Sequence, residues 1–128
     1  MRFLLVAALL LTACGGAGTP APSVSPTPIA GAVLVTRAND RGTVHARVGD
    51  RVQIALGADY EWRLDPPDGV VLTRGVQNEL LVRGTQAVWI AAAPGTATVR
   101  ATGTVICPSG QACILIAILF ETTVVVSP

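Results

Sequence analysis

Apolar and polar residues alternate along the chain from residue 32 onward, and this alternation limits the fold more than any other feature. The clearest case runs from Thr96 to Val105, where alanine, valine and glycine occupy one phase and threonine and arginine the other. Successive side chains of a β-strand point to opposite faces, so the pattern predicts a half-buried strand with a polar face. Outside the first residues, no stretch sustains the 3.6-residue period of an amphipathic helix.

Several short segments have the composition of strands and are separated by turn residues. They cover residues 32–36, 43–48, 51–56, 60–64, 70–73, 86–92, 96–105 and 113–126, and an apolar run at 79–82 is of undetermined type. Asp65-Pro66-Pro67-Asp68-Gly69 is a strong turn, because proline fixes φ and glycine accepts a positive φ. About seven to nine short strands at this spacing predict an all-β fold, an antiparallel immunoglobulin-like β-sandwich. A small β-barrel is the alternative.

The first 14 residues have the order of an export signal. A positive start, Met1-Arg2, precedes the apolar run Phe3–Leu11, which is too short for a helix that must span about 20 residues. Leu11-Thr12-Ala13-Cys14 resembles the lipobox of bacterial lipoproteins. The resemblance implies cleavage before Cys14, lipid on its thiol, and a position on the extracytoplasmic side of an envelope membrane. A plain secretory signal with a chance cysteine, or a buried N-terminal element, is the alternative.

Residues 14–30 read as a linker between this signal, residues 1–13, and a domain at 31–128. The segment from Thr19 to Pro28 has four prolines and no charge. An extended polyproline conformation, at about 3.1 Å per residue, would hold the domain roughly 30–45 Å from a membrane. Simple disorder is the alternative, and both conformations make a tether.

Composition excludes one class of partner. The formal net charge is +1 and 13% of residues are charged, without a basic cluster. Nucleic-acid binding needs a basic surface, so we expect no nucleic-acid partner. The same lack of a polybasic run leaves the lipid on Cys14 as the expected membrane contact, with another protein as a further possible partner.

With Cys14 assigned to lipid, Cys107 and Cys113 remain as an even pair, and an exported chain favours a disulfide between them. The enclosed residues form a candidate partner-binding loop: Pro108, Ser109, Gly110, Gln111 and Ala112. A zinc site is the weaker alternative, because His45 is the single histidine and lies far away in sequence.

The run Ile114–Phe120 is apolar in both phases of the alternation. Such a run fits a central strand that is covered on both sides. We therefore expect it in the core. The alternative is an exposed apolar patch beside the disulfide-closed loop, of the kind that marks interaction sites.

No cluster of residues has the pattern of a catalytic, cofactor or metal site. His45 lacks a nucleophile motif to partner it, and Asp59 and Glu61 are expected on one solvated strand face. Asp65 and Asp68 fit turn formation, and they lack the spacing of a calcium loop. The aromatic residues fall on apolar phases and are expected in the core, and they are Tyr60, Trp62 and Trp89.

Five segments of the domain resemble the chagasin-type protease inhibitors, a family of immunoglobulin-like β-sandwiches. These segments are Val48–Leu56, Tyr60–Leu64 with the later Val70–Leu72, Gly95–Val99 and Phe120–Val126. In that family, three loops block the cleft of papain-like cysteine proteases.

The loop sequences of the chain depart from that family. Only Gly57-Ala58-Asp59 stands before Tyr60, where the family carries Asn-Pro-Thr-Thr-Gly, and the glycine-rich pattern is absent around Asn78–Gly84. The Cys107–Cys113 loop replaces the family's Arg-Pro-Trp, so no inhibitory residue is carried over. We therefore expect a lipid-anchored binding or structural module without enzymatic activity, and a chagasin-like inhibitor with altered loops is the alternative.

Overall fold

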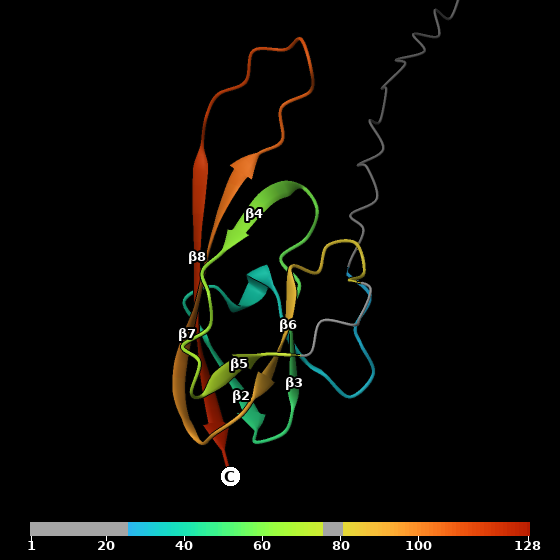
Figure 1. Ribbon diagram of the computed structural model, residues 1–128. Coiled ribbons are helices and arrows are strands. Elements are labelled where there is room, and N and C mark those ends of the chain that lie inside the picture. Colours follow the sequence, from blue (N-terminus) through green and yellow to red (C-terminus); the bar gives the residue numbers. More distant parts are fainter. Residues whose placement is uncertain (1–25, 76–80) are drawn as a thin grey trace, which may run out of the picture.

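The computed structural model describes residues 26–75 and 81–128, which form two β-sheets packed face to face (Figure 1). One short 3-10 helix, η1 (Arg37–Asn39), follows the first strand. The strands are β1 (Val33–Val35), β2 (Thr43–Arg47), β3 (Arg51–Ile54), β4 (Tyr60–Leu64), β5 (Leu72–Arg74), β6 (Ala87–Ala91), β7 (Gly95–Val105) and β8 (Ala117–Ser127). The expected all-β sandwich is thus confirmed.

Each sheet has four strands, in the orders β1-β3-β6-β5 and β2-β8-β7-β4. The expectation of purely antiparallel sheets is wrong, because β1 pairs parallel with β3 and β2 pairs parallel with β8. The reason lies in the connections. The chain crosses from one sheet to the other between β1 and β2 and again between β2 and β3, so β1 and β3 run in the same direction.

The core lies between the two sheets and is made by one phase of each strand. On β7, for example, the buried side chains alternate with exposed threonine and arginine, as the sequence predicts. Trp89 of β6 is buried opposite Val52 of β3 and is the largest side chain of this layer. Burial of a side chain of this size contributes roughly 2–3 kcal/mol of hydrophobic stabilisation, so these alternating positions hold the sandwich together.

The outer side of β3 is also buried, which alternation alone does not predict. Gln53 has no exposed surface. Its side-chain amide donates to the Thr27 carbonyl oxygen at 3.0 Å and to Thr85 Oγ1 at 2.8 Å, and its carbonyl oxygen accepts from the Ile29 N–H at 2.7 Å. The last residues of the expected linker therefore lie against this sheet.

Strand boundaries match the expected ones best on β4 and β7 and worst on β8. The last strand begins at Ala117 instead of Cys113. The strand expected at 70–73 is observed as Leu72–Arg74, because the N–H groups of Val71 and Leu72 are bound by Asp68 in the preceding turn. Of the undetermined run at 79–82, residues 79 and 80 lie outside the described residues, and Leu81 and Val82 lie in a connection.

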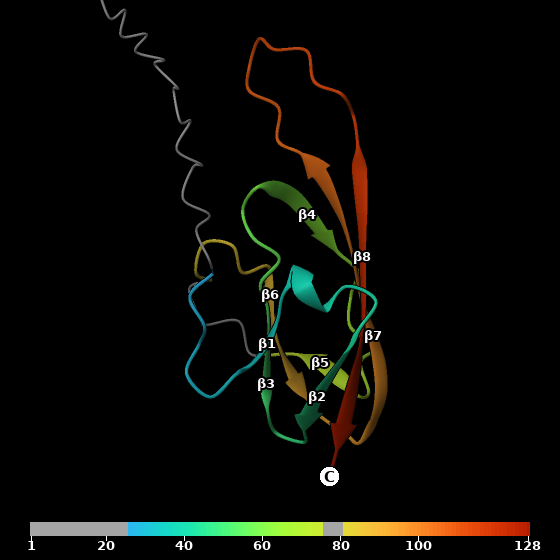
Figure 2. The same ribbon diagram turned by 180° about the vertical axis from the view of Figure 1, so that it is seen from behind.

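The β7–β8 hairpin is longer than the other strand pairs and projects beyond the body of the sandwich (Figures 1 and 2). Its pairs run from Gly95 opposite Val126 to Thr104 opposite Ala117. At the projecting end, β4 covers one side of β7 by pairing Tyr60 with Val105. The connections 55–59 and 81–86 lie at this same end, whereas the chain terminus at Pro128 lies at the opposite end.

Candidate interaction site

The projecting end of the β7–β8 hairpin carries the candidate loop. The expected disulfide between Cys107 and Cys113 is confirmed, with 5.9 Å between the two Cα atoms. It closes a loop whose five enclosed residues are all exposed, and they are Pro108, Ser109, Gly110, Gln111 and Ala112. The structure therefore places every residue of the candidate loop together, at the point of the molecule farthest along the hairpin.

Few internal contacts shape this loop. The Gln111 N–H donates to the Pro108 carbonyl oxygen at 3.2 Å, which closes a turn, and Gly110 has φ +82°. A left-handed φ of this kind favours glycine, since a side chain there meets steric strain. The Cys107 sulfur lies 3.3 Å from the Gln111 carbonyl oxygen. The disulfide and one turn are thus the main restraints on the loop.

Apolar side chains surround the base of the loop, and we call Val105–Ile106 and Ile114–Leu119 the apolar neck. Ile114 is 78% exposed, Leu115 is 94% exposed and Leu119 is 77% exposed, and Ile106 and Ile116 are also exposed. The expectation that Ile114–Phe120 lies in the core is therefore wrong except for Phe120, which is buried. The neck extends past the opposing sheet (Figures 1 and 2), and of its residues only Ile118 is partly buried. Exposed apolar side chains gathered in one place are typical of interaction surfaces.

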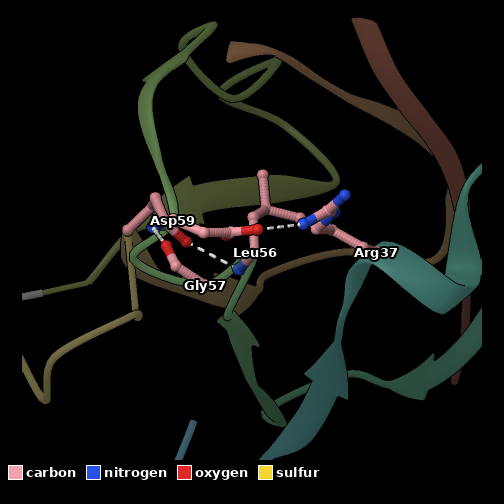
Figure 3. Close-up of polar contacts among 5 residues, drawn as sticks. Arg37, Leu56, Gly57 and Asp59 are labelled. Carbon is pink, nitrogen blue, oxygen red and sulfur yellow. Dashed lines mark hydrogen bonds and ion pairs between the residues drawn. The ribbon is translucent and has the colours of Figure 1, made fainter. Parts of the chain in front are cut away.

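The connections 55–59 and 81–86 lie next to one another at the same end of the sandwich. The Gly57 N–H of the first donates to the Gly84 carbonyl oxygen of the second at 3.0 Å. The Gln86 side chain binds the first of these connections from the other side, by accepting from the Leu56 N–H at 2.7 Å and donating to the Gly57 carbonyl oxygen at 2.8 Å (Figure 3). Gly57 has φ +97°, so a glycine is required at this bend. These bonds fix the backbone of both connections.

A charged and aromatic cluster adjoins them. Arg37 of η1 donates to Asp59 at 2.6 Å (Figure 3). Its guanidinium also lies 5.2 Å from the centroid of the Tyr60 ring, and that ring meets Trp62 edge-on at 5.9 Å. Both partners of the ion pair are about half exposed, so the pair adds little stability and chiefly orients the side chains. The Trp62 Nε1 group is buried without a hydrogen-bond partner among the described residues.

The remaining candidates for chemistry are not brought together. His45 is exposed on the outer face of β2, and Glu61 is exposed on the outer face of β4. Asp59 precedes β4 and pairs with Arg37, so strand alternation does not place it beside Glu61. Of the aromatic residues, Trp89 is buried as expected, whereas Tyr60 and Trp62 are partly exposed.

Asp68 acts as a turn former. Its carboxylate accepts from the Val71 N–H at 3.0 Å and from the Leu72 N–H at 2.8 Å. Partial desolvation raises the pKa of Asp68, but the bonds from these backbone groups outweigh it and hold the pKa below its ordinary value. The carboxylate is thus kept ionised by the turn that it closes, and no metal is needed to explain it.

Within residues 26–75 and 81–128, no group of three or more histidine, cysteine or acidic side chains is placed to hold a metal ion. None of the helical segments in that part of the chain is long and apolar enough to cross a membrane. Cys14 and the rest of the expected signal lie outside the described residues, as do positions 78–80 of the glycine-rich comparison.

Sequence reasoning missed Arg37, Gln53 and Gln86, whose side chains hold the loop end in place. Single polar residues of this kind carry no periodic signal, because their partners come from other strands and connections. Gln53 is the exception in part. It occupies the polar phase of its strand, and the next residue in the same phase, Ala55, is small and apolar, which is a weak sign that this face is covered.

Comparison with known proteins gives no family. No family model matches the chain, and no curated protein matches it in sequence. Among solved structures, the chain is similar to the solution structure of Amebosin, with a TM-score of 0.44 and 18% sequence identity. That match covers 75% of this chain and 98% of the other. The fold described above therefore rests on the strand pairing of this chain.

Proposed function

We propose that the protein is a lipid-anchored, extracytoplasmic module that binds a protein partner through the end of the β7–β8 hairpin. The observation that carries the proposal is the exposed apolar neck below a disulfide-closed loop, which projects from the body of the sandwich. Covering an exposed apolar surface with a partner stabilises the complex by about 25 cal/mol per Å² of apolar area removed from water. A disulfide limits the number of loop conformations and so lowers the entropy lost on binding.

The anchor in this proposal is Cys14, on the strength of the signal-like residues before it. The position of the first described residues supports a role for the tether. Pro26 lies beside Gly84, 3.7 Å from where a side chain on that glycine would begin. The tether therefore enters the domain at the hairpin end, and residues 15–25 would reach about 34 Å if extended at 3.1 Å per residue.

Anchoring is tested by replacing Cys14 with serine and following the protein through membrane fractionation and metabolic lipid labelling. We expect loss of both membrane retention and label in the variant. Labelling that persists without the Cys14 thiol would refute the lipid assignment, while leaving the hairpin proposal to be tested by itself.

Partner binding is tested by shortening the hairpin. Replacing residues 106–115 with Asn-Gly leaves Val105 opposite Ile116 and restores a two-residue turn, which suits the twist of antiparallel strands. Crosslinking on intact cells should capture a partner with the native chain and lose it with this variant. The matched control, Thr96→Ser with Thr98→Ser, alters the exposed face of β7 toward its other end and should retain the partner. Equal capture by both variants would exclude the hairpin end as the site.

The second candidate function is inhibition of a papain-like cysteine protease. The specific observation that favours it is that connections 55–59 and 81–86 and the hairpin end all lie at one end of the sandwich. Three adjacent loops at one end make a surface that enters a cleft. The measurement is papain activity at micromolar protein. A rate that falls in proportion to the added protein supports inhibition, and an unchanged rate ends it.

A further inference from the structure

Half of β8 has an open edge. On the side away from β7, β2 pairs only with the segment from Thr123 to Ser127. The next contact along that side comes from the end of η1, where Asp40 accepts from the Glu121 N–H at 3.0 Å and the Arg41 N–H donates to the Glu121 carbonyl oxygen at 2.6 Å. Beyond Glu121, no described residue pairs with this side of β8, and both views show it free (Figures 1 and 2).

The direction of the backbone groups on this edge follows from Glu121. Its N–H and carbonyl groups point away from β7, and in a strand every second residue points the same way. Leu119 and Ala117 therefore direct their N–H and carbonyl groups to the open side. Unpaired strand edges of this kind are templates for another strand, and proteins usually protect them with charge or proline. Neither occurs between Ile114 and Phe120.

The sequence along this edge reads the same in both directions. Leu115-Ile116-Ala117-Ile118-Leu119 is a palindrome centred on Ala117. When two identical strands pair antiparallel across a two-fold axis, equal steps on either side of the axis lie opposite one another. An axis at Ala117 sets Leu115 opposite Leu119 and Ile116 opposite Ile118. Like side chains then meet, on the same face of the sheet.

We propose that this edge pairs with the same edge of a second copy of the chain, antiparallel and with the two-fold axis at Ala117. The inference rests on the proposed function, because it names the partner of the same hairpin. Ala117 exchanges two hydrogen bonds with its copy, and Leu119 exchanges two with Leu115 of the other chain in each symmetry-related pair. The tight turn that joins the Ile116 N–H to the Ile114 carbonyl oxygen opens, and the neck lengthens β8.

The observations favour a second copy over the two other occupants. A lipid bilayer would cover the apolar side chains but leave the backbone groups of the edge and of the loop unpaired, which is costly in hydrocarbon. A strand of a different protein could also pair with the edge, but such pairing gives no reason for the sequence of the edge to be a palindrome. Charge does not oppose self-association, since no residue from Ala101 to Phe120 is charged.

Crosslinking through an introduced cysteine tests the axis directly. The Cα atoms of a hydrogen-bonded antiparallel pair lie about 5.5 Å apart, within the range of a disulfide. Ala117→Cys in the full-length protein, extracted in detergent and oxidised, should give a dimer on a non-reducing gel. The matched control is Thr104→Cys, because Thr104 is exposed directly opposite Ala117 but on β7. Wild-type protein on the same gel shows how much dimer forms through Cys14 alone. Equal dimer from both variants, or none from Ala117→Cys, overturns the proposal.

A second experiment measures mass in solution and does not depend on an added cysteine. Leu119→Pro removes an N–H that faces the open edge but not one that binds β7, and should weaken dimerisation by more than about tenfold. Leu119→Thr keeps the N–H and should retain the dimer. The thermal unfolding midpoint shows whether each variant is folded.

A native chain that is monomeric at high micromolar concentration overturns the inference. If the hairpin-shortened variant still loses a captured partner, the proposed function stands without it. Binding of the native chain to neutral phospholipid vesicles as a monomer would favour the bilayer instead.

Discussion

The Trp62 ring leaves no room for a side chain at Gly103. Gly103 lies opposite Trp62 across the β4–β7 pair, and a Cβ atom added to it would lie 2.8–3.0 Å from the indole ring. The ring must move for any larger residue to fit. Gly103→Ala should therefore lower the free energy of unfolding by about 1–3 kcal/mol, the usual cost of overpacking. Urea denaturation measures it, with Thr102→Ala as the neighbouring control. A change below about 0.5 kcal/mol would show that the ring swings out freely.

Asp68 gives a prediction about acid stability. Its folded pKa lies below the ordinary value of 3.8, so the ionised form stabilises the fold. That contribution is complete above the unfolded pKa and is lost as the pH falls through the folded pKa. Asp68→Asn should thus lower the unfolding midpoint at pH 6 but have a smaller effect near pH 2.5. Asp65→Asn, which changes a charge in the same turn without removing these backbone bonds, is the control. An effect of equal size at both pH values would contradict this assignment.

At the scale of the element, Gln53 joins the segment before β1 to sheet strand β3. Replacement by leucine keeps the size but leaves the Ile29 N–H and Thr27 carbonyl without their partners, at a cost of about 1–3 kcal/mol. We expect faster hydrogen exchange at the Ile29 amide, well before global unfolding. Gln111→Leu makes the same change in the exposed loop and should leave that exchange rate alone. Unchanged exchange in Gln53→Leu would mean that the segment is held by other contacts.

Individual strands were predictable to different degrees, and β7 and β8 show why. β7 faces the core on one side and water on the other, so its alternation reports its surroundings directly. The start of β8 is apolar on both sides, which fits a covered central strand equally well. What decides between core and surface is the length of the hairpin relative to the opposing sheet. That length depends on β3 and β6, which are distant in sequence and only four and five residues long.

The candidate site shows the same limit. The disulfide and its loop were predictable from the number and spacing of the cysteines. The contacts that fix the neighbouring connections were not, because Gln86 binds residues 29 and 30 positions away in sequence and Arg37 binds one 22 positions away. The parallel pairing of β1 with β3 and of β2 with β8 also escaped prediction, since local patterns carry no information on which sheet a short strand joins.

At the scale of the whole molecule, the residues that stabilise the fold and the residues of the candidate site lie in different parts of the hairpin. The buried apolar residues of the hairpin lie before Val105 and after Leu119, so the sandwich owes little to the end that carries the loop and neck. Replacing residues 106–115 with Asn-Gly should therefore change the free energy of unfolding by less than about 1 kcal/mol, since a shorter loop costs less entropy to close.

That variant separates stability from association in one measurement. Urea unfolding should show one cooperative transition at nearly the native midpoint, while partner capture is lost and self-association is weakened, because the variant lacks the Leu115 that pairs with Leu119 of the second copy. A large loss of stability would mean that the neck supports the core, and the two functional proposals would then need single substitutions in the neck instead. A stable variant that associates as strongly as the native chain would place the contact surface elsewhere on the sandwich, with the exposed threonine face of β7 as the next surface to test.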